Sequence, residues 1–329
     1  MSAGLQLPPT APGARLLGTG SFRPERVVTN EDLAKRVDTD DAWIRSRVGI
    51  AERRVADADT SLPDMAVAAG RAALTDAGLD PSDVDAVIVA TCTMPNPIPN
   101  AAAQVADRLG AGGVAAFDVN TACAGFCYGL GVANDMIRSG TARHVLVIGA
   151  EKLSDWIDWD DRSTCIIFAD AAGAAVVGAA AEDEVGIGPV AWGSAGDHAT
   201  TIRILGESTN KLHQEGQTVF RWATGEIAPV ALDAIARAGL EPADIDVLIP
   251  HQANLRIVEA IAKRLRAKGA REDLVVADDI VTTGNTSSAS IPVALDHMRA
   301  AGRVRSGDTM LLVGFGAGLS YAGQVVVCP

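Results

Sequence analysis

The chain has 329 residues, a formal net charge of −13, 48% hydrophobic residues and only 4% aromatic residues. This length suffices for one large domain or two fused ones, and the negative charge argues against nucleic acid or an anionic membrane as a partner. No apolar run approaches the roughly eighteen residues of a membrane span, and the N-terminus does not resemble a signal peptide. Five irregularly spaced cysteines indicate reduced thiols, so we expect a cytoplasmic protein.

Helical and apolar segments alternate along the chain. In chain order the sequence predicts a helix over 64–77, a strand over 84–91, an extended segment over 112–119, a helix over 126–138, strands over 144–150, 166–170 and 173–180, a helix over 226–238, a strand over 246–250, helices over 252–268 and 290–300, and a strand over 309–315. Val- and Ile-rich strands between helices are typical of sheets covered on both faces, which indicates the α/β class.

Three segments recur in the same order about half a chain apart. AGLDPSDVDAVI at 77–88 returns as AGLEPADIDVLI at 238–249, and NTACAG at 120–125 returns as NTSSAS at 285–290. RSGTARHVLVIGA from Arg138 similarly faces RSGDTMLLVGFGA from Arg305. We therefore expect two copies of one αβ unit, 1–185 and 186–329, packed in layers around a pseudo-twofold axis.

Cys123 lies in DVNTACAGF, between an extended apolar segment and an Ala- and Gly-rich helix. A helix N-terminus lowers the pKa of a thiol and offers unpaired N–H groups to an oxyanion, and the small neighbours leave room for a substrate carbonyl. A buried structural cysteine is the alternative interpretation, and this motif alone does not decide between the two.

His251 and Asn285 are the other two candidate catalytic residues. His251 opens HQAN directly after the predicted strand 246–250, and it is the only one of the five histidines at such a turn. Asn285 takes the position that Asn120 has in the first copy, so the pseudo-twofold axis would bring its loop close to Cys123. Either residue could have a purely structural role, but Cys, His and Asn at equivalent strand ends together indicate catalysis.

The segment GFGAG at 314–318 ends the last predicted strand. It lacks the Lys-Ser/Thr of a phosphate-binding loop, so we interpret it as backbone close to the site with an N–H available to an oxyanion. Cys127 follows Cys123 by four residues without further ligands nearby, and the sequence predicts neither a metal site nor a redox cofactor.

Four segments resemble the motifs of one known family. TACAGFCYGL, HQANLRI, GNTSSASIP and GFGAG are similar to those of β-ketoacyl-acyl-carrier-protein synthase III, a thiolase-fold ketosynthase, and the similarity covers nearly the whole chain. The resemblance implies a five-layered αβαβα sandwich and a homodimer. It also implies that Cys123 is the nucleophile, that His251 and Asn285 complete a triad, and that backbone N–H groups of Cys123 and Ala317 form an oxyanion hole.

The implied reaction is a decarboxylative Claisen condensation that begins fatty-acid or polyketide synthesis. Cys123 takes the acyl group of an acyl-coenzyme A primer, and malonyl-acyl carrier protein then loses carbon dioxide. His251 and Asn285 donate hydrogen bonds to the enolate, which attacks the acyl-enzyme and gives 3-oxoacyl-acyl carrier protein.

Three further sets of residues are assigned through the resemblance. Trp43 and Arg47, four apart on one helix face, would bind the nucleotide of coenzyme A together with Arg162, although a packed Trp beside solvated arginines is the plainer alternative. The carrier protein would dock on three basic residues of the helix 252–268, which could otherwise be only a solvated face: Arg256, Lys263 and Arg264. The acyl pocket would include Phe315 and Ile98, the latter replacing a Phe that often closes the pocket from the partner subunit.

Two departures from the family pattern bear on the acyl donor and acceptor. FADAAGA at 168–174 replaces the usual FGDGAGA, and the segment 197–214 is shorter than is common. One alternative is a relative that transfers the acyl group to a hydroxyl or amine without decarboxylation, but Asn285 favours condensation because an enolate needs two donors. A thiolase would need a second catalytic cysteine in 314–318, and a non-catalytic chain-length factor would be expected to lack Cys123.

Overall fold

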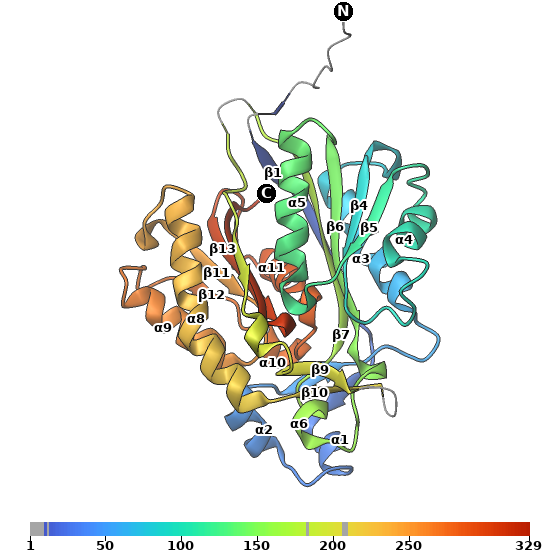
Figure 1. Ribbon diagram of the computed structural model, residues 1–329, viewed down its shortest axis with the longest axis vertical. Helices are drawn as coiled ribbons and strands as arrows, with labels where there is room; N and C mark the ends of the chain where they lie inside the picture. Colours follow the sequence, from blue (N-terminus) through green and yellow to red (C-terminus); the bar gives the residue numbers. More distant parts are fainter. Residues whose placement is uncertain (1–9, 12, 182–183, 206–209) are drawn as a thin grey trace, which may run out of the picture.

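Two five-stranded sheets form the frame of the computed structural model, which describes residues 10–11, 13–181, 184–205 and 210–329 (Figure 1). The strands of the first sheet are β1 (Ala14–Phe22), β4 (Ala86–Ala90), β5 (Ala115–Val119), β6 (His144–Lys152) and β7 (Asp170–Ala179). Those of the second are β8 (Ala191–Ser194), β11 (Val247–Pro250), β12 (Val275–Val276), β13 (Thr309–Gly316) and β14 (Ser320–Val327).

Both sheets have the same topology. Their strand orders are β1-β7-β6-β4-β5 and β8-β14-β13-β11-β12. In each order the first two pairings are antiparallel and the last two are parallel. This agreement is what two copies of one unit would produce, while the division of the chain at 185/186 remains a prediction.

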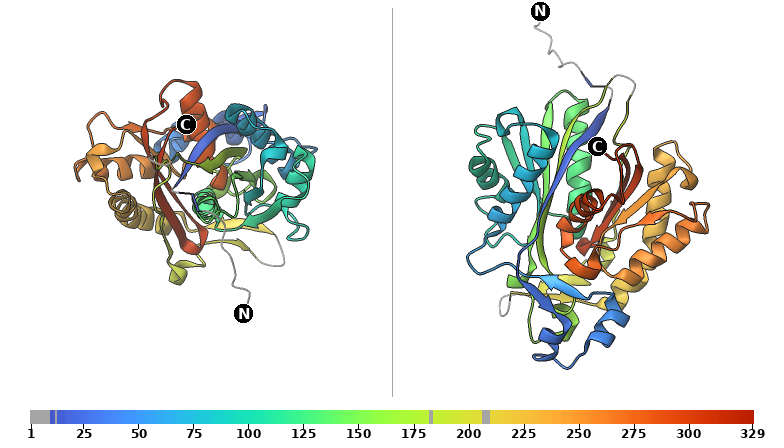
Figure 2. Two further views of the ribbon diagram at one scale, coloured as in Figure 1. Left: turned by 90° about the horizontal axis from the view of Figure 1, so that it is seen from above. Right: turned by 180° about the vertical axis from the view of Figure 1, so that it is seen from behind.

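Helices cover the outer faces of both sheets and also lie between them (Figure 2). The main helices are α3 (Leu62–Ala77), α4 (Ala101–Leu109), α5 (Gly125–Arg138), α8 (Gly216–Arg237), α9 (Leu255–Arg266) and α11 (Ser290–Ala300). Buried side chains of α3 and α4 pack on the first sheet, those of α8 and α9 on the second, and those of α5 and α11 lie between the two sheets. The predicted five-layered αβαβα sandwich is therefore confirmed.

A group of small elements, here called the cap, lies at the end of the sandwich where β6 ends and β7 begins (Figure 1). Its members are β2 (Val27–Thr29), α1 (Asn30–Ala34), α2 (Asp41–Val48), β3 (Glu52–Arg54), α6 (Arg162–Cys165), β9 (Ile202–Leu205), β10 (Lys211–Gln214) and α10 (Ile280–Thr283). The cap has its own apolar cluster, which includes Ile44, Ile50 and Ile157. Within the described residues no helix is long and apolar enough to cross a bilayer.

Short 3-10 turns connect these elements: η1 (Pro81–Asp83), η2 (Ala122–Ala124), η3 (Leu153–Asp155), η4 (Gly196–His198), η5 (Pro242–Asp244), η6 (Ser287–Ala289) and η7 (Ala317–Leu319). The repeated segments use them alike. Gly78 follows α3 with φ 68° and Gly239 closes the turn after α8 with φ 73°, a backbone conformation that favours glycine. A turn that begins with proline and a buried strand follow in both copies.

Several predicted boundaries are wrong, and a tertiary contact explains one of them and a local helix cap another. Residues 166–170 were expected to be a strand, but they form a turn in which Phe168 bridges to Asn285, and only Asp170 begins β7. The buried Arg53 guanidinium donates to the Ile166 carbonyl at 2.8 Å, so this carbonyl is bonded to a side chain and not to the backbone of a neighbouring strand. The helix predicted from 252 begins only at Leu255, because the side chain of Asn254 caps it. The helix predicted over 226–238 in fact begins at Gly216.

Candidate active site

A cavity of about 920 Å³, here called the active-site cavity, brings the predicted catalytic residues together. Cys123, His251 and Asn285 all line it, as do Phe315 and Ala317. Its walls come from both sheets and from the cap. Ile98 does not occur among the described residues that line the cavity of its own chain, and it is 85% exposed.

Cys123 lies in η2, one turn before α5, in a tightly folded segment. Ala122 has φ 47°, in the left-handed region that a residue with a Cβ rarely adopts, so the turn before the thiol is strained. On the other side the end of β13 touches the cysteine: a Cβ added to Gly316 would lie 2.7 Å from the Cβ of Cys123 and 3.0 Å from its Sγ. Only glycine at this position leaves room for the thiol.

Burial raises the pKa of the Cys123 thiol to about 12; the nearby Ser287 hydroxyl offsets part of this rise and the Glu151 carboxylate adds to it. Burial thus opposes the lowered pKa expected at a helix N-terminus, and the thiol is protonated at neutral pH. Attack on a thioester therefore requires the thiol proton to leave as the substrate binds.

His251 is 2% exposed and follows β11 directly. Its Nδ1 lies 2.7 Å from the Ser290 hydroxyl, which also accepts the Gln252 N–H at 3.3 Å. The hydroxyl can donate to Nδ1, and with this assignment the ring proton is on Nε2. The Phe315 ring meets the imidazole edge-on with centroids 5.2 Å apart. Burial lowers the pKa of His251 to about 3, so the ring is neutral and donates through Nε2.

The amide of Asn285 is oriented by its own loop. Its Oδ1 accepts the Ser287 N–H at 2.9 Å, which leaves the Nδ2 amino group as the available donor. The same turn occurs in the first copy, where Asn120 accepts the Ala122 N–H at 3.4 Å. Ser287 also repeats the strained φ of Ala122, with a value of 50°. The predicted correspondence between the two loops therefore extends to their backbone.

A buried arginine holds the Asn285 backbone in place from the cap. Asn285 donates its N–H to the Ile167 carbonyl and accepts the Ala169 N–H, both at 2.9 Å. Arg53 fixes the adjoining Ile166 carbonyl and also donates to Asn30 Oδ1 at 2.8 Å. The sequence analysis missed Arg53, because no local pattern marks an arginine that is fully buried.

Arginines line the mouth of the active-site cavity. The guanidinium of Arg162 lies 4.6 Å and that of Arg47 5.5 Å from the centre of the Trp43 ring, so the three residues predicted to bind a nucleotide are together. Two arginines that the sequence analysis did not select, Arg203 and Arg221, also line the cavity. No Asp or Glu occurs among the described residues that line it. In a chain of charge −13 this selects an anionic ligand.

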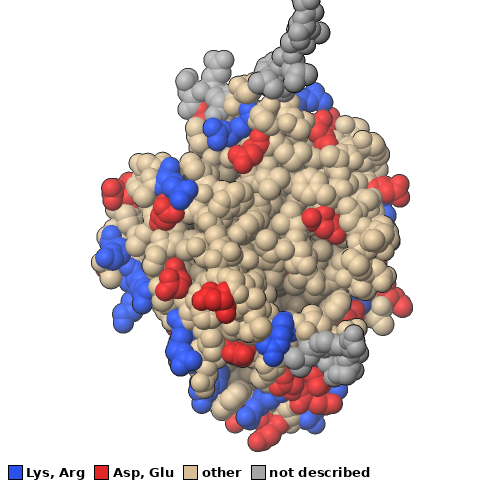
Figure 3. Space-filling model, in the orientation of Figure 1, with Lys and Arg blue, Asp and Glu red and all other residues tan. Residues whose placement is uncertain are grey.

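The three predicted docking residues, Arg256, Lys263 and Arg264, are exposed on α9. Arg256 stacks on the Phe220 ring at 5.0 Å and also lines the active-site cavity, while Arg264 donates to the Gly225 carbonyl at 2.8 Å. Figure 3 shows Lys and Arg side chains along the lower left edge of this face, where α8 and α9 lie in Figure 1. Of these three residues, Arg256 is the one that connects α9 to the mouth of the cavity.

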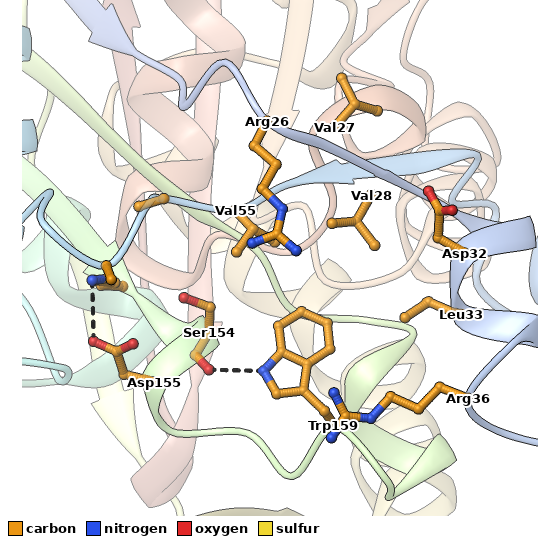
Figure 4. Close-up of a pocket in the computed structure, with 13 residues that line it drawn as sticks. Arg26, Val27, Val28, Asp32, Leu33, Arg36, Val55, Ser154, Asp155 and Trp159 are labelled. Atoms are coloured by element: carbon orange, nitrogen blue, oxygen red, sulfur yellow. Dashed lines mark hydrogen bonds and ion pairs between the residues drawn. The ribbon is translucent and has the colours of Figure 1, made fainter.

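A second cavity, of about 590 Å³, lies in the cap (Figure 4). Trp159 lies at its centre and donates from Nε1 to the Ser154 carbonyl at 3.2 Å, and Arg26 and Arg36 face the ring. No cysteine or histidine occurs among the described residues that line it. Across the described part of the chain, no cluster of three or more His, Cys, Asp or Glu residues has the arrangement of a metal site.

The layered fold, and a cysteine, a histidine and an asparagine in one cavity, define a thiolase-fold ketosynthase. The structure superposes on the priming β-ketosynthase of the R1128 polyketide biosynthetic pathway with a TM-score of 0.94 and 42% identity, covering 99% of both chains. It superposes on 3-oxoacyl-[acyl-carrier-protein] synthase III of Aquifex aeolicus with a TM-score of 0.90 and 39% identity, covering 96% of this chain and 100% of that one.

Sequence comparison identifies the family. The family models for 3-oxoacyl-[acyl-carrier-protein] synthase III and its C-terminal part match residues 117–196 and 235–328. β-Ketoacyl-[acyl-carrier-protein] synthase III 4 of Streptomyces coelicolor is 51% identical over 318 residues, which cover 96% of this chain and 99% of that protein. The chain belongs to the β-ketoacyl-[acyl-carrier-protein] synthase III family, and it is an acyltransferase of that type, as the sequence motifs predicted.

Proposed function

We propose that this enzyme condenses an acyl-coenzyme A primer with malonyl-acyl carrier protein, and that Cys123, His251 and Asn285 carry out the reaction. The observation that carries the proposal is that two residues with neutral hydrogen-bond donors, His251 through Nε2 and Asn285 through Nδ2, line the same cavity as the Cys123 thiol. Two donors at one oxygen stabilise an enolate, which is the intermediate that decarboxylation produces.

In the first half of the reaction Cys123 Sγ attacks the thioester carbonyl of the primer. The oxygen becomes negative and accepts hydrogen bonds from the backbone N–H groups of Cys123 and Ala317, and coenzyme A leaves as its thiol with the proton that Cys123 loses. Gly316 supports this assignment because its close contact with Cys123 brings the 316–317 backbone to the thiol.

In the second half malonyl-acyl carrier protein places its thioester oxygen between His251 Nε2 and Asn285 Nδ2. Loss of carbon dioxide leaves an enolate at this oxygen, and its carbon attacks the acyl group on Cys123. The Cys123 thiolate leaves and takes up a proton from solvent, and the product is 3-oxoacyl-acyl carrier protein. Phe315 packs edge-on against His251 and forms an apolar wall of the site. Such a wall solvates a carboxylate poorly, so it favours conversion of the malonyl carboxylate to neutral carbon dioxide.

The low pKa of His251 favours condensation over transfer to a hydroxyl or amine. A general base acts best when its pKa is near the working pH, and a group with a pKa of about 3 removes protons poorly at pH 7. The low pKa does not impair hydrogen-bond donation, because the neutral ring still carries a proton on Nε2. The acyl-transfer alternative needs the base, whereas the condensation needs the donor.

The substrates are anionic, and the charged surface fits them. Trp43, Arg47 and Arg162 would hold the adenine and phosphates of coenzyme A at the mouth of the cavity. Arg256, Lys263 and Arg264 would bind an acidic carrier protein, whose pantetheine arm enters beside Arg256. We place the enzyme in the cytoplasm, where both substrates and reduced thiols are available.

We further propose a homodimer formed through β5, which is the last strand of the first sheet. Phe117 and Val119 on this strand are only partly buried, as are Tyr128 and Met136 on the neighbouring α5. An apolar edge of this kind pairs with its own copy around a twofold axis. The exposed Ile98 would then reach the acyl pocket of the partner subunit.

Two measurements test the proposed function. Intact-protein mass spectrometry after mixing with acyl-coenzyme A thioesters should show one acyl adduct, and Cys123→Ala should show none. His251→Ala and Asn285→Ala should still form the adduct but release carbon dioxide from malonyl-carrier protein on the order of 10²- to 10³-fold more slowly, as for a lost oxyanion donor. Loss of acylation with normal decarboxylation would instead make His251 the base of an acyltransferase.

A further inference from the structure

Glu151, at the end of β6, is completely buried beside the active-site cavity. Its two carboxylate oxygens lie within hydrogen-bond distance of six donor groups that come from both halves of the chain: the Thr91 hydroxyl (3.2 Å), the Cys92 N–H (3.2 Å), the Cys92 thiol (3.4 Å), and the hydroxyls of Thr93 (2.5 Å), Ser287 (3.0 Å) and Ser288 (2.8 Å). The Ser288 hydroxyl shares its proton with the Ala90 carbonyl, which is also 2.8 Å away. The carboxylate is therefore the centre of a network in which each oxygen has at least three partners.

This network contains no cation. Among the described residues no Lys or Arg forms an ion pair with Glu151, and the ammonium of the adjacent Lys152 turns away to the Asp57 carbonyl and to Asp155. Burying an unpaired carboxylate costs several kcal/mol unless hydrogen bonds replace its lost solvation. A packed apolar residue would avoid this cost, so packing alone does not explain a glutamate here.

The network ends at the catalytic groups. Ser287, which donates its hydroxyl to Glu151, uses its backbone N–H to fix Asn285 Oδ1 at 2.9 Å. Its strained φ of 50° has to be held by tertiary contacts, and the hydrogen bond to Glu151 is one of them. Cys92, which is held through its N–H and its thiol, lines the active-site cavity together with Cys123. Glu151 thus contacts two segments that line the cavity of Cys123, and these segments also approach each other, with Cys92 Sγ 3.8 Å from the Ser287 hydroxyl.

We propose that Glu151 is a positioning residue: it fixes the Ser287 loop, and through it the donor amide of Asn285, against the Cys92 and Cys123 segments. The proposal rests on the proposed function, because a displacement of the Asn285 amide would be detected as a lower rate of condensation. Glu151 touches neither substrate nor reacting atoms, and it acts through Ser287.

The reactivity of the Cys123 thiol distinguishes this positioning role from a role in stabilising the fold. Glu151 raises the pKa of the Cys123 thiol, whereas the Ser287 hydroxyl lowers it. The other titratable groups near the thiol are Cys92, which lines the cavity, His251 across it, and Cys127 on α5. Removing the charge of Glu151 and removing the hydroxyl of Ser287 should therefore change the reactivity of Cys123 in opposite directions.

The experiment uses the full-length enzyme in four variants: Glu151→Gln, Glu151→Asp, Ser287→Ala and Asp85→Asn. The rate of Cys123 alkylation by iodoacetamide is measured from pH 7 to 10, beside the kcat and KM of condensation. Asp85 is the matched control, since it accepts hydrogen bonds from Arg143 N (2.7 Å) and His144 N (3.1 Å) at the opposite end of the same strand.

We expect Glu151→Gln to be alkylated faster than the wild type at each pH and Ser287→Ala more slowly. Both should lower the kcat of condensation, on the order of 10²-fold for Glu151→Gln, with KM for the primer little changed, because a misplaced catalytic group costs about this much. Glu151→Asp keeps the charge and should retain the wild-type alkylation profile. Asp85→Asn should change the melting temperature alone.

Unchanged alkylation in both Glu151→Gln and Ser287→Ala, or a condensation rate of Glu151→Gln equal to that of the wild type, would overturn the proposal. If Glu151→Gln does not fold, Glu151→Asp decides the matter: its shorter side chain should lower the kcat of condensation at a wild-type alkylation profile, and a wild-type kcat would overturn the proposal. If the wild type itself does not condense the substrates, the proposed function fails, and the alkylation comparison still tests whether Glu151 acts on the site.

Discussion

Gly316→Ala should disable the nucleophile while leaving the fold intact. The backbone of Gly316 is extended, with φ −177°, so alanine meets no conformational penalty there and the effect is purely steric. The new Cβ would lie 2.7 Å from the Cβ of Cys123 and 2.8 Å from its N, whereas ordinary contacts begin at 3.4 Å. Cys123 or the β13 backbone therefore has to move by about 0.7 Å or more.

The expected magnitudes follow from this displacement. Overpacking costs about 1–3 kcal/mol of stability, which a large domain tolerates with a lower melting temperature. A shift approaching 1 Å at a reacting atom costs on the order of 10²-fold in rate, and the oxyanion donors move with the same backbone. Acylation should therefore fall much more than stability does.

The assay follows the acyl adduct by intact-protein mass spectrometry in time, with a thermal melt of each variant. Gly225→Ala is the matched control: it lies within α8, where a Cβ would meet nothing within 4 Å, and it should stabilise the protein by about 0.5–1 kcal/mol at an unchanged acylation rate. A Gly316→Ala enzyme that acylates as fast as the wild type would show that the contact does not position the thiol.

Three further predictions concern charge and binding. Charge reversal of Arg256 and Arg264 to Glu should raise KM for malonyl-carrier protein and weaken the salt dependence of this KM, without slowing acylation by acyl-coenzyme A. Charge reversal of the exposed Arg71 on α3 should change neither the KM nor its salt dependence. If the two charge reversals had equal effects on this KM, α9 would not be the docking surface. Trp43→Ala should raise KM for the primer more than it lowers kcat, and a fall in kcat alone would contradict nucleotide binding there. Burial lowers the His251 pKa from 6.5 to about 3, so between these pH values the unfolded chain binds a proton at His251 that the folded protein does not bind. The folded state therefore loses stability as the pH falls. Between pH 7 and 4 the melting temperature of His251→Asn should fall less than that of the wild type, and an equal fall in both proteins would refute this.

The sequence by itself predicted the architecture, and it selected three residues that the structure places in one cavity. Strands rich in Val and Ile, helices at amphipathic spacing and three repeated segments are local or internal patterns, and they predicted the layered α/β sandwich. Cys123 and His251 could be selected because each follows a recognisable strand in a short, specific motif. Asn285 could be selected because its motif repeats that of Asn120, although it follows the helix α10 and not a strand. The contact of Trp43 with Arg47 was also predictable, since it depends only on helical spacing.

Tertiary structure alone decided what surrounds these residues. The turn at 166–169 has the composition of a strand, and the distant Arg53 and Asn285 impose its conformation. The cluster around Glu151 joins residues 136 and 137 positions apart, which no periodicity reveals. The protonation of Cys123 and His251 depends on burial by both halves of the chain. For Cys123, burial raises the pKa of the thiol, whereas its position at a helix N-terminus had predicted a lowered pKa. Desolvation depends on every atom that excludes water from a site, and those atoms come from the whole fold.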